Sequence, residues 1–237
     1  MIGSAAAVVA LNALFCAAGV GILRALGGWK TPRGALRRSG VAYCVGVGAA
    51  GTALQLALVL GIPFGVPLVV GTCVALAAAG IAPVHGRDAS AARRPSRALA
   101  LPVTLIAVTL ALLAVDTLFQ PLGAWDAWAQ WTAKAKALVL FGGLDTSYLA
   151  SAPYRAWNPD YPVALPAIEA AAFAFMGEFD TQVIHLQFWF LLAGFALALV
   201  ELLRERVSAA LLYPSVLLVV LAPTVQNLTA GALADVP

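Results

Sequence analysis

The sequence predicts an all-α, polytopic membrane protein with about six transmembrane helices and further interfacial helices in a long outer loop. Composition is the first reason, because 62% of the 237 residues are hydrophobic, only 11% are charged, and the mean hydropathy is +0.92. A soluble domain has about 25% charged residues. The second reason is that the chain contains long uncharged stretches, each able to cross about 30 Å of hydrocarbon as a helix.

The uncharged stretches define the predicted spans. The stretch after Arg38 has about twice the length that one crossing needs. Residues 61–67 (GIPFGVP) interrupt it with a turn signal, and the prolines of this segment have no backbone N–H to donate. This stretch therefore predicts a helical hairpin. The six predicted spans lie near residues 3–25, 40–60, 66–84, 98–119, 181–203 and 207–226.

The positive charges are distributed unevenly over the predicted loops. Eleven of the fourteen Lys and Arg residues fall in three loops that alternating spans place on one side, which the positive-inside rule assigns to the cytoplasm. We therefore predict a multi-pass protein of the plasma membrane, with its N-terminus outside and residues 120–180 in an extracytoplasmic loop. The net charge of +3 reflects this asymmetry and predicts no nucleic-acid partner. The eleven are Arg24, Lys30, Arg33, Arg37, Arg38, Arg87, Arg93, Arg94, Arg97, Arg204 and Arg206.

Residues 163–177 (VALPAIEAAAFAFMG) form an apolar segment that is not counted as a span. The segment is short for a bilayer crossing and contains Pro166 and Glu169. We predict a helix that lies at the outer interface, or that dips into the membrane and returns. Either arrangement keeps the whole region 119–180 on one face of the membrane.

Several residues inside the spans predict packing rather than chemistry. The three cysteines, Cys16, Cys44 and Cys73, lack metal-ligand spacing and are expected to be packing residues. The glycines of residues 45–51 (VGVGAAG) predict close helix packing. His185 is expected to form a local hydrogen bond rather than a proton relay.

The outer loop opens with a tryptophan-rich segment. At 100° per residue, Trp125, Trp128 and Trp131 fall on one helical face, whereas Asp126 points away from it. Indole rings favour the headgroup level of a membrane, so we predict a helix lying on the outer leaflet with Asp126 raised above it. Two interpretations follow: an amphipathic anchor with a solvated carboxylate, or a base or ligand acting on a lipid-delivered substrate.

Later in the loop, residues 153–162 (PYRAWNPDYP) place charged, amide and aromatic groups between prolines that fix the backbone. Such a rigid polar segment is typical of a loop that presents binding groups, although a turn that re-enters the membrane has a similar sequence. Beyond the sixth span, Asp235 is predicted to return to the same outer face. We also expect the chain to be the N-terminal part of a longer protein, inactive on its own.

The order of spans, outer loop, proline-rich turn and outer acids in residues 98–237 resembles the N-terminal part of GT-C fold membrane glycosyltransferases. The resemblance is to members of the protein mannosyltransferase and aminoarabinose transferase type. Asp126 matches the catalytic acid of the first outer loop, residues 158–162 (NPDYP) match the proline-rich turn, and Asp235 matches the acid of the second outer loop. The sequence departs from the family at Ala127, where many members have a second acid, and at the Asn of the turn, where a His is common. Residues 1–97 are then a three-span N-terminal extension with Arg-rich cytoplasmic loops.

The resemblance implies transfer of a sugar from a polyprenyl-phosphate donor to an unknown acceptor at the extracytoplasmic face, with inversion at the anomeric carbon. In such a displacement a carboxylate takes the proton of the attacking hydroxyl, and the resemblance assigns this role to Asp126. Cations neutralise the phosphate of the leaving group. The expected substrate-binding residues are Arg155, Lys134, Lys136, Asn158, Asp160, Tyr161 and Asp235.

No cofactor is required by this scheme, although Asp160 and Asp235 are candidate ligands of a divalent cation. These two carboxylates are alternatively expected to orient the acceptor. The rival function is a non-catalytic membrane scaffold or a fragment of a transporter. Ion-coupled carriers usually place ionisable groups near mid-membrane, beside broken helices.

Overall fold

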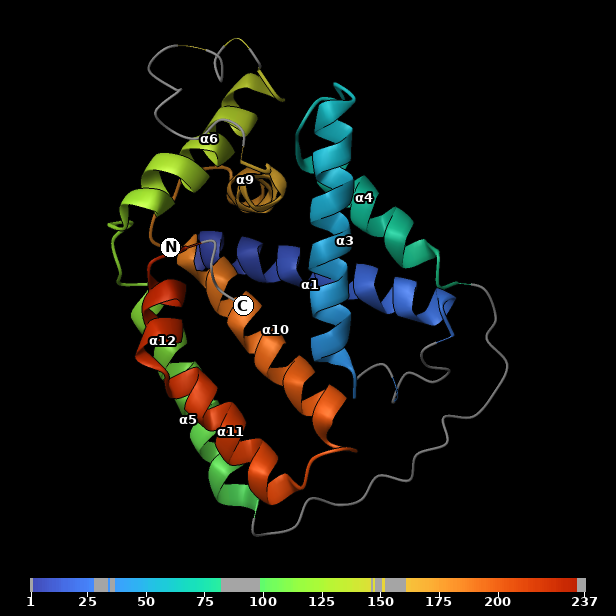
Figure 1. Cartoon of the computed structure of the whole chain (residues 1–237). Helices are drawn as coiled ribbons and strands as arrows, with labels where there is room; N and C mark the ends of the chain where they lie inside the picture. Colours follow the sequence, from blue (N-terminus) through green and yellow to red (C-terminus); the bar gives the residue numbers. More distant parts are fainter. Residues whose placement is uncertain are drawn as a thin grey trace.

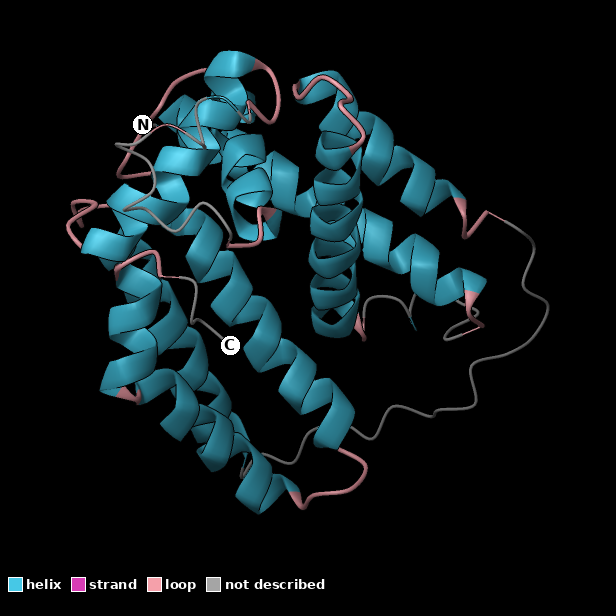
Figure 2. Cartoon of the chain, turned by 45° about the horizontal axis from the view of Figure 1, so that its top comes forward, coloured by secondary structure: helices cyan, strands magenta, loops and turns pink. Residues whose placement is uncertain are grey.

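The computed structural model describes residues 2–27, 34, 37–81, 99–145, 147, 151 and 161–233. Within these residues the fold is all-α, and Figure 2 shows no strand in the described chain. The prediction of the fold class is therefore confirmed. The helices are α1 (Ile2–Ala25), α3 (Ser39–Val59), α4 (Val66–Ala78), α5 (Ala100–Thr117), α6 (Thr132–Phe141), α9 (Ala164–Met176), α10 (His185–Leu203), α11 (Ala209–Leu221) and α12 (Pro223–Ala230), with a π-helical turn, η2 (Ala127–Trp131), directly before α6.

Four helices, α1, α3, α5 and α10, are long and apolar enough to cross a membrane. The bent pair α11 and α12, with an angle of 52° at their junction, provides a fifth candidate. The bend falls at Ala222 and Pro223, where the proline ring cannot continue the hydrogen-bonding pattern of α11. The predicted third span, 66–84, differs from the structure, because α4 has 13 residues, equivalent to about 20 Å.

The helices form two packed groups that share α10 (Figure 1). In the first group, α1 packs against α3, α4 and α9, and α6 covers α9. In the second group, α5 and α11 lie side by side next to α10. The side chain of Trp189 in α10 joins this group, because its indole N–H donates a 2.8 Å hydrogen bond to the backbone oxygen of Leu110 in α5.

Glycine allows α1 and α3 to approach closely. A Cβ atom built on Gly46 of α3 would lie 1.8 Å from the backbone oxygen of Phe15 in α1, and one built on Gly19 would lie 1.7 Å from that of Ala42. Any side chain at these positions would force the helices apart. The predicted close packing of the segment 45–51 is thus confirmed at Gly46.

A buried polar cluster connects α1, α3 and α10. It consists of Asn12, Tyr43 and Gln187, all of which are buried. The Asn12 and Gln187 amides exchange two hydrogen bonds, of 2.8 and 3.1 Å, and the Tyr43 hydroxyl donates a 2.6 Å bond to Asn12 Oδ1. Because an unsatisfied amide costs more in apolar surroundings than in water, this cluster fixes the relative positions of the three helices.

The helix α9 corrects one prediction. A helix lying flat at the membrane surface would expose one face, but residues 166–173 of α9 are all buried. The small side chains of its alanine-rich sequence allow α1, α3 and α6 to pack around it. Since α9 contacts α1 and α3, helix contacts cross the predicted boundary at residue 97. The division of the chain at this residue stays a prediction.

Candidate functional site

The segment 120–180 contains the candidate site, and Asp126 lies near its start. Asp126 is exposed and directly precedes η2, and its Oδ1 accepts a 3.0 Å hydrogen bond from Nε2 of Gln130. Gln130 itself is buried, so this bond anchors an exposed carboxylate to a fixed amide. The predicted exposure of Asp126 is confirmed.

The tryptophans of this segment do not form one common face. Trp125 and Trp128 are 52% and 45% exposed, whereas Trp131 is partly buried and stacks on Tyr161 with ring centroids 5.7 Å apart. The prediction assumed an α-helix throughout. The wider turn of η2 changes the angle between successive residues within it, and Trp131, its last residue, faces the protein instead.

Lys134 also differs from the prediction. It was expected to be an outer cation that meets a lipid phosphate, but it is only 2% exposed. Its ammonium lies 5.8 Å from the ring centroid of Trp131 and 5.5 Å from that of Tyr161, so two aromatic faces stabilise its charge. Lys134 therefore ties α6 to Tyr161 and does not present its charge at the surface.

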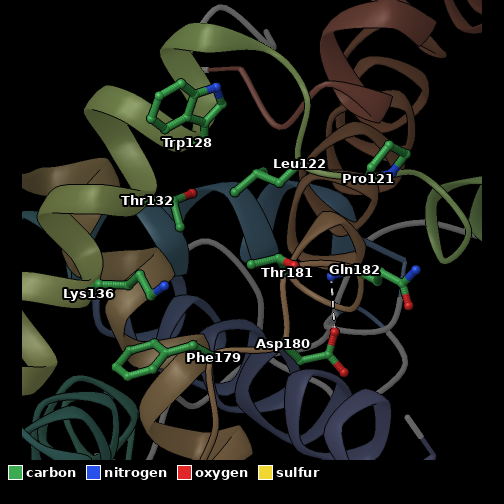
Figure 3. Close-up of a pocket in the computed structure, with 9 residues that line it drawn as sticks. All are labelled: Pro121, Leu122, Trp128, Thr132, Lys136, Phe179, Asp180, Thr181 and Gln182. Carbon is green, nitrogen blue, oxygen red and sulfur yellow. Dashed lines mark hydrogen bonds between the residues drawn. The ribbon is translucent and has the colours of Figure 1, made fainter.

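Lys136 lines a cavity of about 620 Å³. Trp128, Thr132 and Lys136 form one wall, since positions four residues apart stack on one side of a helix. Figure 3 shows the Lys136 side chain pointing from this wall toward the segment 179–182. The ammonium lies 5.1 Å from the ring centroid of Phe179. The lining residues are Pro121, Leu122, Trp128, Thr132, Lys136, Phe179, Asp180, Thr181 and Gln182.

The opposite wall is held by Asp180. Its Oδ1 accepts hydrogen bonds of 3.0 and 2.9 Å from the backbone N–H groups of Gln182 and Val183, which fixes the turn that leads into α10 (Figure 3). His185 begins α10, and its Nδ1 lies 2.9 Å from the backbone oxygen of Gln182, as the predicted local bond requires. The cavity thus has one wall from α6 and one from a rigid turn.

A buried carboxyl group lies behind the α6 wall. Glu169 of α9 is fully buried, and its Oε2 accepts a 3.0 Å hydrogen bond from the Thr132 hydroxyl. Its Oε1 finds no hydrogen-bond partner among the described residues. Burial raises the pKa of Glu169 from 4.5 to about 8, and the Thr132 bond opposes this rise. The group is therefore uncharged at neutral pH.

The cavity is lined by one basic side chain, Lys136, one acidic side chain, Asp180, several hydroxyl and amide groups, and aromatic rings. Lys136 supplies a positive charge, Thr132, Thr181 and Gln182 supply hydroxyl and amide groups, and Trp128 and Phe179 supply ring faces. Among the described residues, no group of three or more His, Cys, Asp or Glu side chains could hold a metal ion.

The structure brings some predicted site residues together and leaves others untested. Asp126, Lys134 and Lys136 share the helix formed by η2 and α6, and Tyr161 packs against it. Four predicted site residues lie outside the described residues: Arg155, Asn158, Asp160 and Asp235. The predicted cation site formed by Asp160 and Asp235 therefore also lies outside them.

The sequence reasoning missed Thr132, Glu169 and the turn at Asp180. Glu169 was considered only as an argument against a seventh span. Its position as the single acid in an otherwise apolar segment, residues 163–176, was the available signal, because an isolated carboxyl in such a segment must find a hydrogen-bond donor. Comparison of the chain with protein-family models, curated proteins and solved structures finds no match.

Proposed function

We propose that the chain belongs to a membrane glycosyltransferase that moves a sugar from a polyprenyl-phosphate donor to an acceptor at the extracytoplasmic face. The position of the cavity carries this proposal. One part of its lining, Pro121 and Leu122, follows the end of α5, and another, the segment 179–182, precedes the start of α10. Both helices are long enough to span a membrane. A cavity at the ends of two spans lies at the depth of lipid phosphates.

The lining supports a phosphate-linked sugar as the ligand. A cation such as Lys136 binds a phosphate directly, and aromatic faces such as that of Trp128 pack against sugar rings or prenyl chains. The volume of about 620 Å³ falls within the range of about 300–1,000 Å³ that is typical of ligand sites. Lys134 is left out of the phosphate site because the residue is buried, with its ammonium next to the stacked rings of Trp131 and Tyr161.

Asp126 is the proposed base. Asp126 is not one of the residues that line the cavity, but it lies two residues before Trp128 of the cavity wall, its carboxylate is exposed, and Gln130 holds its orientation. An acceptor hydroxyl would reach it from outside the cavity and lose its proton during attack on the anomeric carbon. Arg155, Asn158, Asp160, Tyr161 and Asp235 keep the binding roles that the resemblance implies.

The test replaces Asp126 by Asn in the full gene product and measures transfer from undecaprenyl-phosphate-linked hexoses and pentoses in isolated membranes. Loss of the base should lower the transfer rate by about 10²- to 10⁴-fold, with unchanged protein levels in the membrane. Asp116→Asn is the matched control, because Asp116 is also exposed and bonded to the glutamine four residues later, Gln120. Equal transfer rates of Asp126→Asn and wild type would exclude Asp126 as the base.

A further inference from the structure

The α6 wall of the cavity is supported by a contact that does not itself reach the cavity. Thr132 lines the cavity and is 2% exposed, and its hydroxyl donates to Glu169 behind it. Lys136 follows Thr132 by one helical turn on the same side of α6. The position of the Lys136 ammonium therefore depends on how the first turn of α6 is held against α9.

We propose that Glu169 and Thr132 are positioning residues of the cavity: the buried Glu169 carboxyl holds Thr132, and thereby sets the place of Lys136 for a phosphate ligand. This inference rests on the proposed function only in its choice of phosphate as the ligand. The contact between α6 and α9 exists without any ligand.

Charge is the variable that should release this contact. The described titratable residues of the elements packed against α9 are Lys134 and Lys136 of α6, Cys16 and Arg24 of α1, Tyr43 and Cys44 of α3, and Cys73 of α4, while η2 has none. The pKa of Glu169 is governed by burial and by the Thr132 bond rather than by these groups. Once the carboxyl ionises, the buried charge favours a more hydrated arrangement, and α9 and α6 separate.

The Glu169 carboxyl is fully buried, and only one of its two oxygens has a hydrogen bond to the described residues, which also indicates that ionisation releases the contact. Oε2 is bonded to Thr132, but Oε1 has no partner among the described residues. An ionised carboxylate needs more hydrogen-bond donors than one hydroxyl supplies, whereas the uncharged acid tolerates this site. The buried site is therefore compatible with the protonated form and unfavourable for the ionised form, because the single Thr132 bond does not offset the cost of burying the charge.

The experiment uses the full chain in lipid nanodiscs and titrates it with undecaprenyl phosphate at pH 7.0, 8.0 and 9.0, with tryptophan fluorescence as the readout. A phosphate monoester is already ionised over this range, since its second pKa is about 6. Wild type should lose up to about tenfold in affinity per pH unit above pH 8. Glu169→Gln, which keeps an acceptor for Thr132 but cannot ionise, should bind with an affinity that does not change with pH.

Further variants separate positioning from folding. Thr132→Val, which keeps the shape but removes the hydroxyl, should weaken binding at pH 7.0, where the contact is intact in wild type, and Thr132→Ser should restore it. Glu178→Gln is the matched control, because Glu178 is an exposed carboxylate after α9 that accepts from Ser4 instead. It should retain the pH profile of wild type. An unchanged profile in Glu169→Gln, or wild-type affinity in Thr132→Val, would overturn the proposal.

Hydrogen exchange of α6 amides, corrected for the intrinsic effect of pH, provides a readout that needs no ligand. Protection should fall above pH 8 in wild type and remain in Glu169→Gln. If wild type binds no undecaprenyl phosphate at any pH, the proposed function fails. The exchange pattern then tests separately whether the contact between Glu169 and Thr132 holds α6. Equal exchange in both proteins across the pH range would show that Glu169 and Thr132 are not positioning residues.

Discussion

At the scale of single residues, the chain places polar groups in apolar surroundings in two contrasting ways. The amide and hydroxyl groups of Asn12, Tyr43 and Gln187 satisfy one another within a closed cluster. Glu169 instead has one hydrogen bond for two oxygens. The first arrangement stabilises a fixed structure, whereas the second makes stability depend on protonation.

Glu169 should therefore make the stability of the protein pH-dependent. Its pKa is about 8 in the folded state and near 4.5 when exposed, so the folded state binds the proton more tightly. The contribution is complete below pH 4.5, declines by up to about 1.4 kcal/mol per pH unit, and is lost above pH 8. We expect Glu169→Gln to gain about 2–3 kcal/mol relative to wild type between pH 5 and 7.

Unfolding by denaturant in detergent at pH 5, 6, 7 and 8 measures this difference. Because other groups titrate equally in both proteins, only the gap between variant and wild type is diagnostic. A gap that stays constant from pH 5 to 8 would show that Glu169 is not buried in its uncharged form. Glu178→Gln again serves as the control, and its gap to wild type should not change with pH.

The exposure and the contacts of a single residue can be predicted from the sequence only where they do not depend on residues that are distant in the sequence. Asp126 is exposed as predicted, but the common tryptophan face from which this exposure was inferred is not formed. The burial of Lys134 was not predicted, because it requires Tyr161, which is distant in the sequence, to cover the ammonium. Glu169 was likewise unpredictable as a partner of Thr132, since 37 residues separate them and only folding brings them together.

At the scale of helices, the sequence predicts apolar segments better than their surroundings. The four long spans α1, α3, α5 and α10 lie where uncharged stretches predicted them. Of the two arrangements predicted for α9, burial speaks against the helix lying flat at the surface, while the helix that dips into the membrane and returns stays a prediction. The alanines and phenylalanines of α9 suit a lipid-facing helix and a protein-enclosed helix equally well. Composition determines that a segment leaves water, and only packing determines whether lipid or protein replaces the water.

The crossing of α1 and α3 gives an element-level prediction with an internal control. Gly46→Ala should destabilise the protein by about 1–3 kcal/mol, because the added Cβ meets the backbone of Phe15, which cannot move aside without shifting α1. Gly48→Ala, two residues later in the same helix, meets no atom within 4 Å and should be neutral or slightly stabilising. Melting temperatures in detergent compare the two, and an equal effect of both would contradict the close crossing.

The N-terminus of α3 depends on another helix rather than on its own residues. Both carboxylate oxygens of Glu201 in α10 accept hydrogen bonds, of 3.0 and 2.9 Å, from the backbone N–H groups of Gly40 and Val41. The residue before α3, Arg38, provides no side-chain cap. The carboxylate therefore takes the place of a local cap, and its negative charge interacts favourably with the positive end of the α3 dipole. Helix capping between distant segments of this kind is not encoded in local sequence patterns.

At the scale of the whole molecule, the proposed function depends on which side of the membrane the cavity faces. The Lys and Arg distribution predicts that residues 120–180 lie outside and that the loop between α10 and α11 lies in the cytoplasm. Single cysteines at Gly143, after α6, and at exposed Glu205, after α10, report these two sides. A Cβ at Gly143 meets no atom within 4 Å, so the substitution is not expected to disturb the fold.

Labelling of intact cells with a membrane-impermeant maleimide should modify Gly143→Cys and leave Glu205→Cys unmodified until the membrane is opened. Wild type, with Cys16, Cys44 and Cys73, sets the background signal. The reverse pattern would place the cavity, Lys136 and Asp126 on the cytoplasmic side, where the proposed extracytoplasmic donor could not reach them. Labelling of both positions from one side would instead show an even number of crossings between them: either α10 does not cross the membrane, or α9 crosses it as well.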